Sequence, residues 1–506
     1  MTGYVGRFIL KNGKDVYGNP WPLWYFDKFG DFYIVLPIYL KGLSTFLFGV
    51  NEFAIRFPSA FLGALSVIPI FFISYWVFEN KKIGYLSALT MAIMPWHIIL
   101  SRASSEGIMG IFFYGYGLML LIGYLKWSRN LLIFISYLFF LISYWIYHPY
   151  RVIVPLTLLS SIAILFIYKD KKRLKALFIG LVLFVLLTGY ISTTKWGKGR
   201  FLQTSIFSPS SEVQLKLQEL IFDEGQRRIL LARIFHNKFL GYGREFMRQY
   251  SSYFSGEYLF TKGGLSYAYS VPQQGLLYFS FLACFIAALI YLLKKNFPKE
   301  QKILIIFLST LLFLIPIPAS LTYIDSPNIQ RSVDMTIIIS IFAGLGAYVL
   351  YKKKKLIFFI TLSILIFEII NFWHNYSLHS NLFTSMYRND GQKQLVNYVK
   401  DNLYKYVEVY IPSYGTMSMY YLFFSNDFTS SYIDKIKYDV KLEQAGKVRF
   451  VDADCINEKI SKENLSRNIM IVELYTCKVN RDKFIQLGLI GGVNKALNFQ
   501  VIIPRL

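Results

Sequence analysis

Residues 335–373 read MTIIISIFAGLGAYVLYKKKKLIFFITLSILIFEIINFW, two apolar runs on either side of four consecutive lysines. A bilayer core about 30 Å thick needs roughly 20 mainly apolar residues to cross it as a helix. Each run therefore predicts a membrane-spanning helix, and the lysines predict a short link at one membrane surface. The rest of the 506-residue chain repeats this pattern, since 55% of its residues are hydrophobic and only 17% are charged. Such a composition excludes a chain made of several soluble domains.

Ten runs of this kind are predicted to span the membrane. A further run at 34–50 is shorter and is interrupted by Pro37, Lys41 and Gly42. It favours a helix that lies in the membrane interface. The ten predicted spans are 57–78, 83–100, 107–125, 131–147, 152–168, 174–192, 274–293, 303–318, 335–350 and 356–373.

The links between these spans alternate in charge. A basic set of five links holds 17 lysines and arginines, whereas three intervening short links hold one arginine each. The positive-inside rule places the basic set in the cytoplasm, so a long loop at 193–273 and the tail from residue 374 are expected outside it, in a multi-pass protein of the plasma membrane. The net charge of +24 is then mostly an orientation signal and predicts no nucleic-acid partner. The basic set is 79–82, 126–130, 169–175, 294–302 and 351–355, and the other links are 101–106, 148–151 and 319–334.

Two stretches have the composition of segments outside the membrane. The loop at 193–273 carries an amphipathic helix around 212–238, followed by an aromatic stretch at 250–260 that either caps the membrane interface or guides a substrate. From about residue 376 the composition is that of a small α/β domain. This domain is predicted to contain a helix at 389–404, capped by Asn389 or Asp390, and strands at 407–411, 448–451, 468–474 and 499–503.

The chain is therefore predicted to have three parts. Residues 1–56 form a first extracytoplasmic loop with the interfacial helix, residues 57–373 form a transmembrane domain, and residues 374–506 form an extracytoplasmic α/β domain. Cys455 and Cys477 both lie in the outer domain, in a compartment where disulfides persist, and either form a bridge or remain two buried thiols. Cys284 lies in a span and is expected to pack there.

Charged side chains close to the membrane are costly and are functional candidates by default. Arginines recur on the outer side, and their planar guanidinium groups suit phosphate oxygens. Each arginine alone is better explained by a carboxylate partner or by lipid headgroups, but the set together favours a site for a lipid phosphate. The candidates for phosphate binding are Arg56, Arg102, Arg151 and Arg331, and the residues expected to line the site are Glu52, His97, Glu106, His148 and Asp325.

The sequence predicts neither a metal site nor a cofactor site. None of the five histidines has a partner four residues further on, so no metal site is predicted. His97 and His148 lie near outer span ends, where a packed or hydrogen-bonded histidine is the simpler explanation. The sequence has no Walker-type loop, no GxSxG motif and no GxGxxG motif between a strand and a helix, so neither a cofactor nor a soluble nucleotide-sugar site is predicted.

Short stretches of characteristic sequence follow one another along residues 3–373. Two of them are fairly specific in this context, Arg56-Phe-Pro-Ser-Ala60 and Pro95-Trp-His-Ile-Ile-Leu-Ser-Arg-Ala103. The others are Gly3-Tyr4, Ile9–Gly18, Phe29–Asp31, Phe48–Ala60, Tyr147–Arg151 and Ala319–Arg331. With these stretches the chain resembles the dolichyl-phosphate-mannose–protein mannosyltransferase-like family of the membrane glycosyltransferase C superfamily, which includes the aminoarabinose transferases acting on lipid A.

The resemblance implies transfer of a sugar, with inversion, from a polyprenyl-phosphate donor to an acceptor outside the cytoplasm, which is a protein, a lipid or a glycan. In this family an acidic residue of the first outer loop acts as the base, and arginines suit stabilisation of the departing lipid phosphate. Asp31 and Asp15 are the family-like carboxylates in this loop, and the resemblance makes them the candidate catalytic residues.

The sequence departs from the family pattern in two places. Relatives usually carry an Asp-Glu pair after an initial span, just before the position of Gly3, so we expect that this chain as written lacks the first span and the usual catalytic Asp. Relatives also follow the position of Asp31 with an aromatic residue and Lys-Pro-Pro. This chain has Phe32-Tyr-Ile-Val35 there, so one phosphate contact is expected to be missing.

Two other functions compete with this prediction. A transporter of lipid-linked sugars predicts internal repeats and broken helices at mid-membrane, whereas the sequence shows no repeat and carries its charges at one face. A non-catalytic membrane scaffold whose outer domain binds a partner is favoured by the missing Asp-Glu pair. The preferred prediction is a polytopic α-helical membrane protein of glycosyltransferase C type with about ten spans and a C-terminal extracytoplasmic α/β domain. Its expected partners are a polyprenyl-phosphate-linked sugar, the acceptor and membrane lipid.

Overall fold

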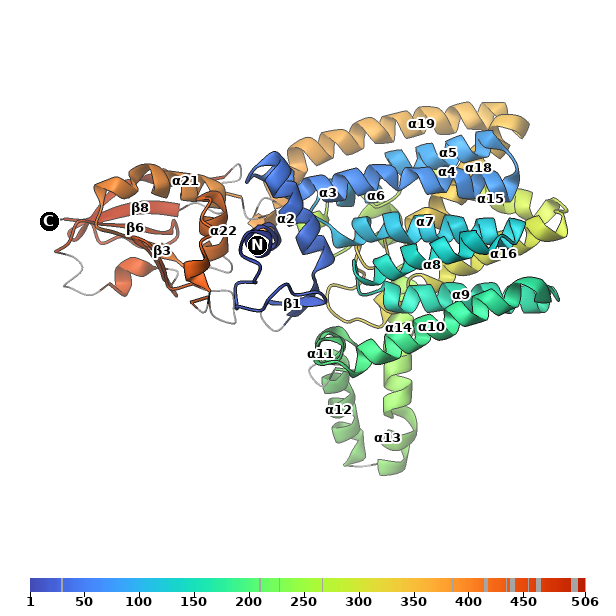
Figure 1. The fold of residues 1–506 in the computed structure, drawn as a ribbon, viewed down its shortest axis with the longest axis horizontal. Coiled ribbons are helices and arrows are strands. Elements are labelled where there is room, and N and C mark those ends of the chain that lie inside the picture. Colours follow the sequence, from blue (N-terminus) through green and yellow to red (C-terminus); the bar gives the residue numbers. More distant parts are fainter. Residues whose placement is uncertain are drawn as a thin grey trace. The chain divides into compact units, whose positions relative to one another are not determined.

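The chain forms two compact units in the computed structural model, the first made of residues 1–58 and 376–506 and the second of residues 59–375. Figure 1 shows both, with the sheet of the first unit in orange and red and the helices of the second from blue to yellow. The structure describes residues 1–28, 31–208, 211–226, 228–265, 267–384, 386–388, 390–413, 417–433, 435–436, 442–453, 455–460, 466–492 and 499–505.

A six-stranded sheet is the centre of the first unit. Its order is β4-β5-β3-β6-β8-β7, with β3 parallel to β5 and β6 and the other pairs antiparallel. The four predicted strands are the four central ones and are confirmed to within one residue at each end. The edge strands β4 and β7 were not predicted, because β7 is largely exposed and contains a glycine. The strands are β3 (Glu408–Pro412), β4 (Gln444–Ala445), β5 (Val448–Val451), β6 (Ile469–Leu474), β7 (Phe484–Ile490) and β8 (Phe499–Pro504).

The N-terminal residues share one hydrophobic core with the sheet. Tyr4 and Phe8 are buried in the same cluster as Val396 and Val409. A Cβ added to Gly6 would lie 2.1 Å from the carbonyl oxygen of Ile38, so α1 and α2 pack with their backbones in contact. The elements are α1 (Thr2–Asn12), the hairpin of β1 (Tyr25–Lys28) and β2 (Asp31–Ile34), α2 (Leu36–Phe48), α20 (Ser380–Thr384), α21 (Gln392–Asn402) and α22 (Met417–Phe424).

Helix α21 is shorter than the predicted helix at 389–404. Its N-cap is Gly391, with a φ of 90°, and the Asp390 carboxylate accepts a hydrogen bond from the Gly391 amide. The expected cap at Asp390 was therefore wrong by one residue, because a backbone in the left-handed region favours glycine. Asn389, the alternative cap, lies outside the described residues. Cys455 and Cys477 form a disulfide, which decides between the two alternatives for this pair.

The second unit is a bundle of apolar helices, and α3 (Glu52–Leu65) leads into it from the first unit. Every predicted span corresponds to a helix or a helix pair. Its helices are α4 (Val67–Phe78), α5 (Lys81–Ile93), α6 (Pro95–Arg102), α7 (Glu106–Trp127), α8 (Asn130–Tyr144), α9 (Tyr150–Ile167), α10 (Leu174–Thr193), α11 (Lys195–Thr204), α12 (Glu212–Gly225), α13 (Ile229–Phe235), α14 (Lys238–Ser252), α15 (Ser280–Lys294), α16 (Lys299–Leu314), α17 (Ile317–Ser320), α18 (Met335–Lys353) and α19 (Lys355–His374).

The described residues contain seven helical stretches long and apolar enough to cross a membrane, and up to eight if the bent pair of α5 and α6 is one span. The bend of 55° falls before Pro95, where Met94 is extended because a proline disfavours helical geometry in the residue before it. Helices α8 and α15 have 15 residues each and are shorter than the spans predicted at 131–147 and 274–293. The bundle confirms a polytopic helical membrane protein.

The two ends of the bundle differ in charge and in structure. The turns α4–α5, α7–α8, α9–α10, α15–α16 and α18–α19, which are the basic links, gather at one end (Figure 1). The long loop begins at the other end. The helix predicted around 212–238 is broken into α12 and α13, and α14 starts where the Asn237 side chain accepts a hydrogen bond from the Leu240 amide at 2.9 Å. An N-cap at this position starts a new helix, so the predicted single helix is divided here.

Candidate functional site

A cavity of about 210 Å³ opens in the second unit at the end of the bundle away from the basic links. Four segments build it: the α8–α9 link, the last turn of α10, helix α11, and the stretch from α17 to α18. These segments are far apart in the sequence, yet each contributes a polar or charged side chain. Among the lining residues are Tyr147, His148, Arg151, Arg200, Thr322 and Arg331.

Arg151 lies in the first turn of α9, and its charged side chain is partly buried. Its Nη1 donates to His148 Nδ1 at 2.8 Å, and its guanidinium lies over the Trp196 ring, 4.8 Å from the centroid. Because an arginine cannot accept a hydrogen bond, Nδ1 is the acceptor and the neutral imidazole carries its proton on Nε2. The buried Arg151 Nε has no acceptor among the described residues. Because this nitrogen is closed to solvent, the guanidinium can meet an anion in the cavity only through its Nη atoms.

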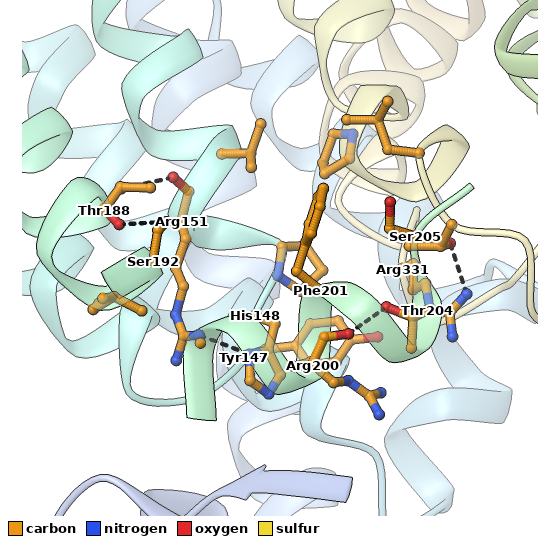
Figure 2. Close-up of a pocket in the computed structure, with 17 residues that line it drawn as sticks. Tyr147, His148, Arg151, Thr188, Ser192, Arg200, Phe201, Thr204, Ser205 and Arg331 are labelled. Carbon is orange, nitrogen blue, oxygen red and sulfur yellow. Dashed lines mark hydrogen bonds between the residues drawn. The ribbon is translucent and has the colours of Figure 1, made fainter. Parts of the chain in front are cut away.

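Arg331 is held from the other side of the cavity. Its Nη1 donates to Thr322 Oγ1 at 2.7 Å and to the Ile324 carbonyl at 2.6 Å, and its amide donates to Asn328 Oδ1 at 3.1 Å. Figure 2 shows Arg151 and Arg331 on opposite sides, with Arg200 of α11 between them. Three guanidinium groups thus converge on one cavity, an arrangement that suits a phosphate group.

Two tyrosines connect this cluster to a carboxylate. Burial raises the pKa of Tyr147, and the charges of Arg331, Glu106 and Arg200 act on its hydroxyl. Burial also raises the pKa of Tyr269 to about 12, and the charge of Glu106 adds to this shift. Glu106, the first residue of α7, therefore lies within electrostatic reach of the Tyr147 hydroxyl, on which the two arginines also act.

Besides Glu106, three of the residues predicted for the site lie outside the cavity lining in the second unit. His97 is buried in α6, where its Nε2 hydrogen bonds with Ser66 Oγ at 3.1 Å. Arg102 is exposed at the end of α6 and lies 5.7 Å from the Trp373 ring centroid. Asp325 is exposed in the α17–α18 connection with a φ of 51°. The cavity thus brings together Arg151, His148 and Arg331 of the predicted set. His97, Arg102 and Asp325 do not line it.

The other predicted residues belong to the first unit. Asp15 is buried, and its carboxylate accepts hydrogen bonds from the Tyr17 and Asn19 amides and from Asn19 Nδ2, each at 2.9 Å. Asp31 begins β2 and pairs with Lys28 across the hairpin. Glu52 starts α3 and forms an ion pair with Lys393 at 2.8 Å. Arg56 is exposed on α3.

Sequence reasoning missed one residue of the cavity and one buried carboxyl outside it. Arg200 follows Trp196 by four residues, one turn of α11, so the two side chains lie on one face of this helix. The signal was present as a tryptophan and an arginine in a glycine-rich stretch, but the prediction for this loop began its helix near residue 212 and named no residue before it. Asp334 is not among the predicted site residues, and it does not line the cavity. It is buried and accepts a hydrogen bond from Tyr150 Oη at 2.8 Å.

Comparison with known proteins shows the fold. No protein family profile and no curated protein sequence matches the chain. The crystal structure of ArnT from Cupriavidus metallidurans bound to undecaprenyl phosphate matches with a TM-score of 0.50 and 9% identity over 99% of this chain and 92% of that chain. The apo structure of the same protein gives a TM-score of 0.41 and 10% identity over the same shares. The first of these likenesses confirms the ArnT-like fold that the resemblance to the aminoarabinose transferases predicts.

Proposed function

We propose that this protein transfers a sugar from a polyprenyl-phosphate donor to an acceptor outside the cytoplasm, with inversion at the anomeric carbon. The observation that carries the proposal is the convergence of Arg151, Arg200 and Arg331 on one cavity of a bundle whose fold is that of ArnT, a protein solved with undecaprenyl phosphate. Charge-assisted hydrogen bonds from guanidinium groups are the usual means of holding a phosphate in a protein.

The arginines have a chemical task in such a reaction. A nucleophilic oxygen or nitrogen of the acceptor attacks the anomeric carbon on the face opposite the phosphate, and the bond between this carbon and the phosphate oxygen breaks. The bonding electrons remain with the lipid phosphate, whose negative charge grows as it leaves. Fixed cations such as Arg151 and Arg331 stabilise that charge without having to reorganise. The basic links at the opposite end of the bundle favour an extracytoplasmic position for this cavity.

The base that receives the acceptor proton is proposed to be Asp31. The resemblance of the first loop to the mannosyltransferase-like family supports either Asp31 or Asp15. The Asp15 carboxylate, however, already accepts three hydrogen bonds from its own loop. Its two oxygens are therefore engaged in holding the loop. Glu106 does not line the cavity, but its charge acts on the Tyr147 hydroxyl together with Arg331 and Arg200, so its proposed role is to balance the charge of the arginines.

A transfer assay tests the proposal. Membrane vesicles containing the protein receive undecaprenyl phosphate linked to radiolabelled mannose or aminoarabinose, and labelled product is separated from lipid. We expect transfer from one of these donors, and Arg331→Gln is expected to lower kcat/KM by roughly tenfold or more, since hydrogen bonds to charged groups contribute about 1.5–3 kcal/mol. Lys198→Gln is the matched control, because Lys198 is exposed on the same helix as Arg200 and lies outside the cavity lining.

The same assay separates the competing functions. A transporter would move labelled donor across the vesicle membrane with the bond between sugar and phosphate intact. A scaffold would neither break this bond nor move the donor. Equal transfer by the wild type and Arg331→Gln would exclude the arginine cavity as the donor site.

A further inference from the structure

Helices α12, α13 and α14 form an arm with uncovered apolar side chains. Phe239 is 85% exposed and Leu230 is 74% exposed. Phe222, Ile229, Ile234 and Phe235 of the same arm are also exposed. Contiguous apolar surface of this kind rarely faces water in a soluble protein and marks an interaction site.

The position of the arm points to the bilayer as its partner. Helices α12 and α14 run across the direction of the spanning helices and lie at the end of α10 (Figure 1). The exposed apolar surface is continuous along the chain from α10, with Leu186 and Tyr190, into α11, with Phe201 and Leu202. A helix pair that crosses the spans at their ends lies at the depth of the lipid headgroups, the geometry of an interfacial amphipathic element.

A cavity of about 410 Å³ lies between α12 and α14. Leu217 and Leu220 give it an apolar wall, and Lys216, Arg244 and Arg248 give it a cationic one. No residue of this cavity lines the arginine cavity of the bundle.

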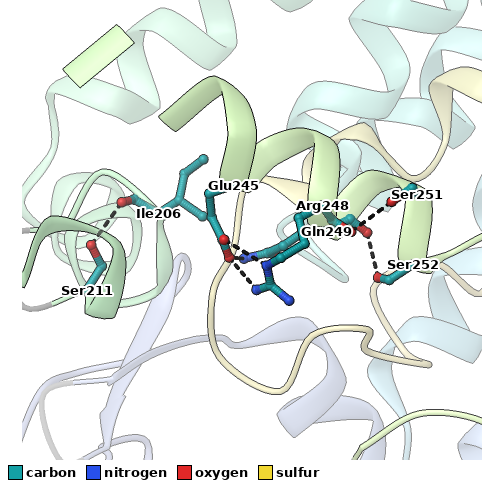
Figure 3. Close-up of polar contacts among 7 residues, drawn as sticks. All are labelled: Ile206, Ser211, Glu245, Arg248, Gln249, Ser251 and Ser252. Carbon is teal, nitrogen blue, oxygen red and sulfur yellow. Dashed lines mark hydrogen bonds and ion pairs between the residues drawn. The ribbon is translucent and has the colours of Figure 1, made fainter. Parts of the chain in front are cut away.

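One carboxylate faces these three cations. Glu245 accepts two hydrogen bonds from Arg248 and one from Gln249 Nε2 at 2.8 Å (Figure 3). Arg244 has no hydrogen bond or ion pair with any part of the chain that the structure describes. The cavity therefore has a positive excess beside an apolar wall, which complements an anionic headgroup with acyl chains attached.

We propose that the α12–α14 arm lies in the membrane interface and that its cavity binds the phosphate headgroup of an anionic phospholipid, whose acyl chains lie along the exposed apolar residues of the arm. This second lipid site is independent of the proposed transfer reaction. It anchors the long loop at the membrane surface next to the donor cavity.

Native mass spectrometry of the full protein tests the lipid site. The protein is purified in detergent and titrated with phosphatidylglycerol or phosphatidylcholine. We expect selective binding of phosphatidylglycerol, and Arg244→Gln is expected to weaken it about fivefold, as for one cation near an anionic lipid surface. Lys238→Gln is the matched control, because Lys238 is exposed on α14 and lies outside the cavity lining.

Three results would overturn the lipid site. The first is equal binding of both lipids. The second is the same loss of binding in Arg244→Gln and Lys238→Gln. The third is displacement of the lipid by millimolar glycerol 3-phosphate, which would show a site for a soluble anion instead.

Spin labels test the depth of the arm separately. Leu230→Cys and Phe239→Cys are made in a Cys284→Ala background and labelled in nanodiscs that contain phosphatidylglycerol. Both labels are expected to be accessible to oxygen, like a label at the exposed Phe178 of α10, and protected from a water-soluble nickel complex. Labels that behave like one at the exposed Tyr404 of the α/β unit would place the arm in water and overturn the proposal.

Discussion

Single side chains decide whether the proposed transfer can occur, and Asp31 is the first to test. If Asp31 takes the acceptor proton, Asp31→Asn should lower kcat by roughly a hundredfold or more, the usual contribution of a general base, and leave the donor KM unchanged. Asp27→Asn is the matched control, because Asp27 lies in the paired strand of the same hairpin. Steady-state transfer kinetics give both constants. Full activity in Asp31→Asn together with lost activity in Glu106→Gln would move the base to Glu106.

Asp334 makes a second prediction, about pH. Burial raises the pKa of this carboxyl from 3.8 to about 7, against the opposing effect of the hydrogen bond from Tyr150. The folded state therefore binds this proton more tightly than the unfolded state does. Its contribution to stability is complete below about pH 4 and is lost as the pH rises through about 7.

Thermal unfolding in detergent between pH 5 and pH 8 measures this contribution. The wild type should lose roughly 2–3 kcal/mol of stability over this range, because about two pH units separate pH 5 from the pKa near 7, and Asp334→Asn should flatten the profile and melt higher at pH 8. Glu300→Gln, a change at an exposed carboxylate in a basic link, should leave the profile as in the wild type. A wild-type profile that Asp334→Asn leaves unchanged would refute the assignment.

At the scale of elements, the contact between α15 and α19 depends on one side chain. No side chain of its own segment caps α15, but Glu368 of α19 accepts hydrogen bonds from the amides of Phe279 at 2.7 Å and Ser280 at 3.1 Å. Thr361 and Phe372 are the only buried residues of α19, so few other contacts hold this helix. Amides at a helix start need acceptors, and water does not supply them within a membrane.

Glu368→Ala is therefore expected to destabilise the bundle by about 1–3 kcal/mol, the cost of amide donors left without acceptors where the membrane excludes water. Thermal unfolding in detergent measures the loss. Phe367→Ala removes a larger side chain from the neighbouring position, but this residue is 70% exposed on the lipid side and should change the melting temperature little. An equal effect of the two substitutions would show that Glu368 has no special role.

Elements with a strong apolar pattern were predictable from the sequence, and those defined by one residue were not. The runs around Lys352–Lys355 predict α18 and α19 because length and hydropathy alone decide a span. The break before Pro95, the cap at Gly391 and the start of α14 at Asn237 depend on local backbone geometry within longer periodic runs. Helix α1 is short, and its apolar face is covered only by segments distant in the sequence.

At the scale of the whole molecule, one part of the candidate site was predictable from the sequence and another part was not. Arg151, His148 and Arg331 were predicted because each is an isolated polar residue beside a span, where charge is costly. Their convergence follows from antiparallel helices, which bring every second link to one end of the bundle. Arg200 was missed because a helix of the long loop carries it to the cavity, and neither hydropathy nor spacing indicates where such a loop folds back.

Binding of undecaprenyl phosphate to the purified protein in nanodiscs tests the central claim most directly, because it requires neither the sugar nor the acceptor. The account predicts saturable binding by the wild type and by Lys198→Gln. The double variant Arg151→Gln/Arg331→Gln is predicted to bind roughly a hundredfold more weakly, since two charge-assisted contacts are lost. Equal affinity of the double variant and the wild type would contradict the claim that these arginines hold the lipid phosphate.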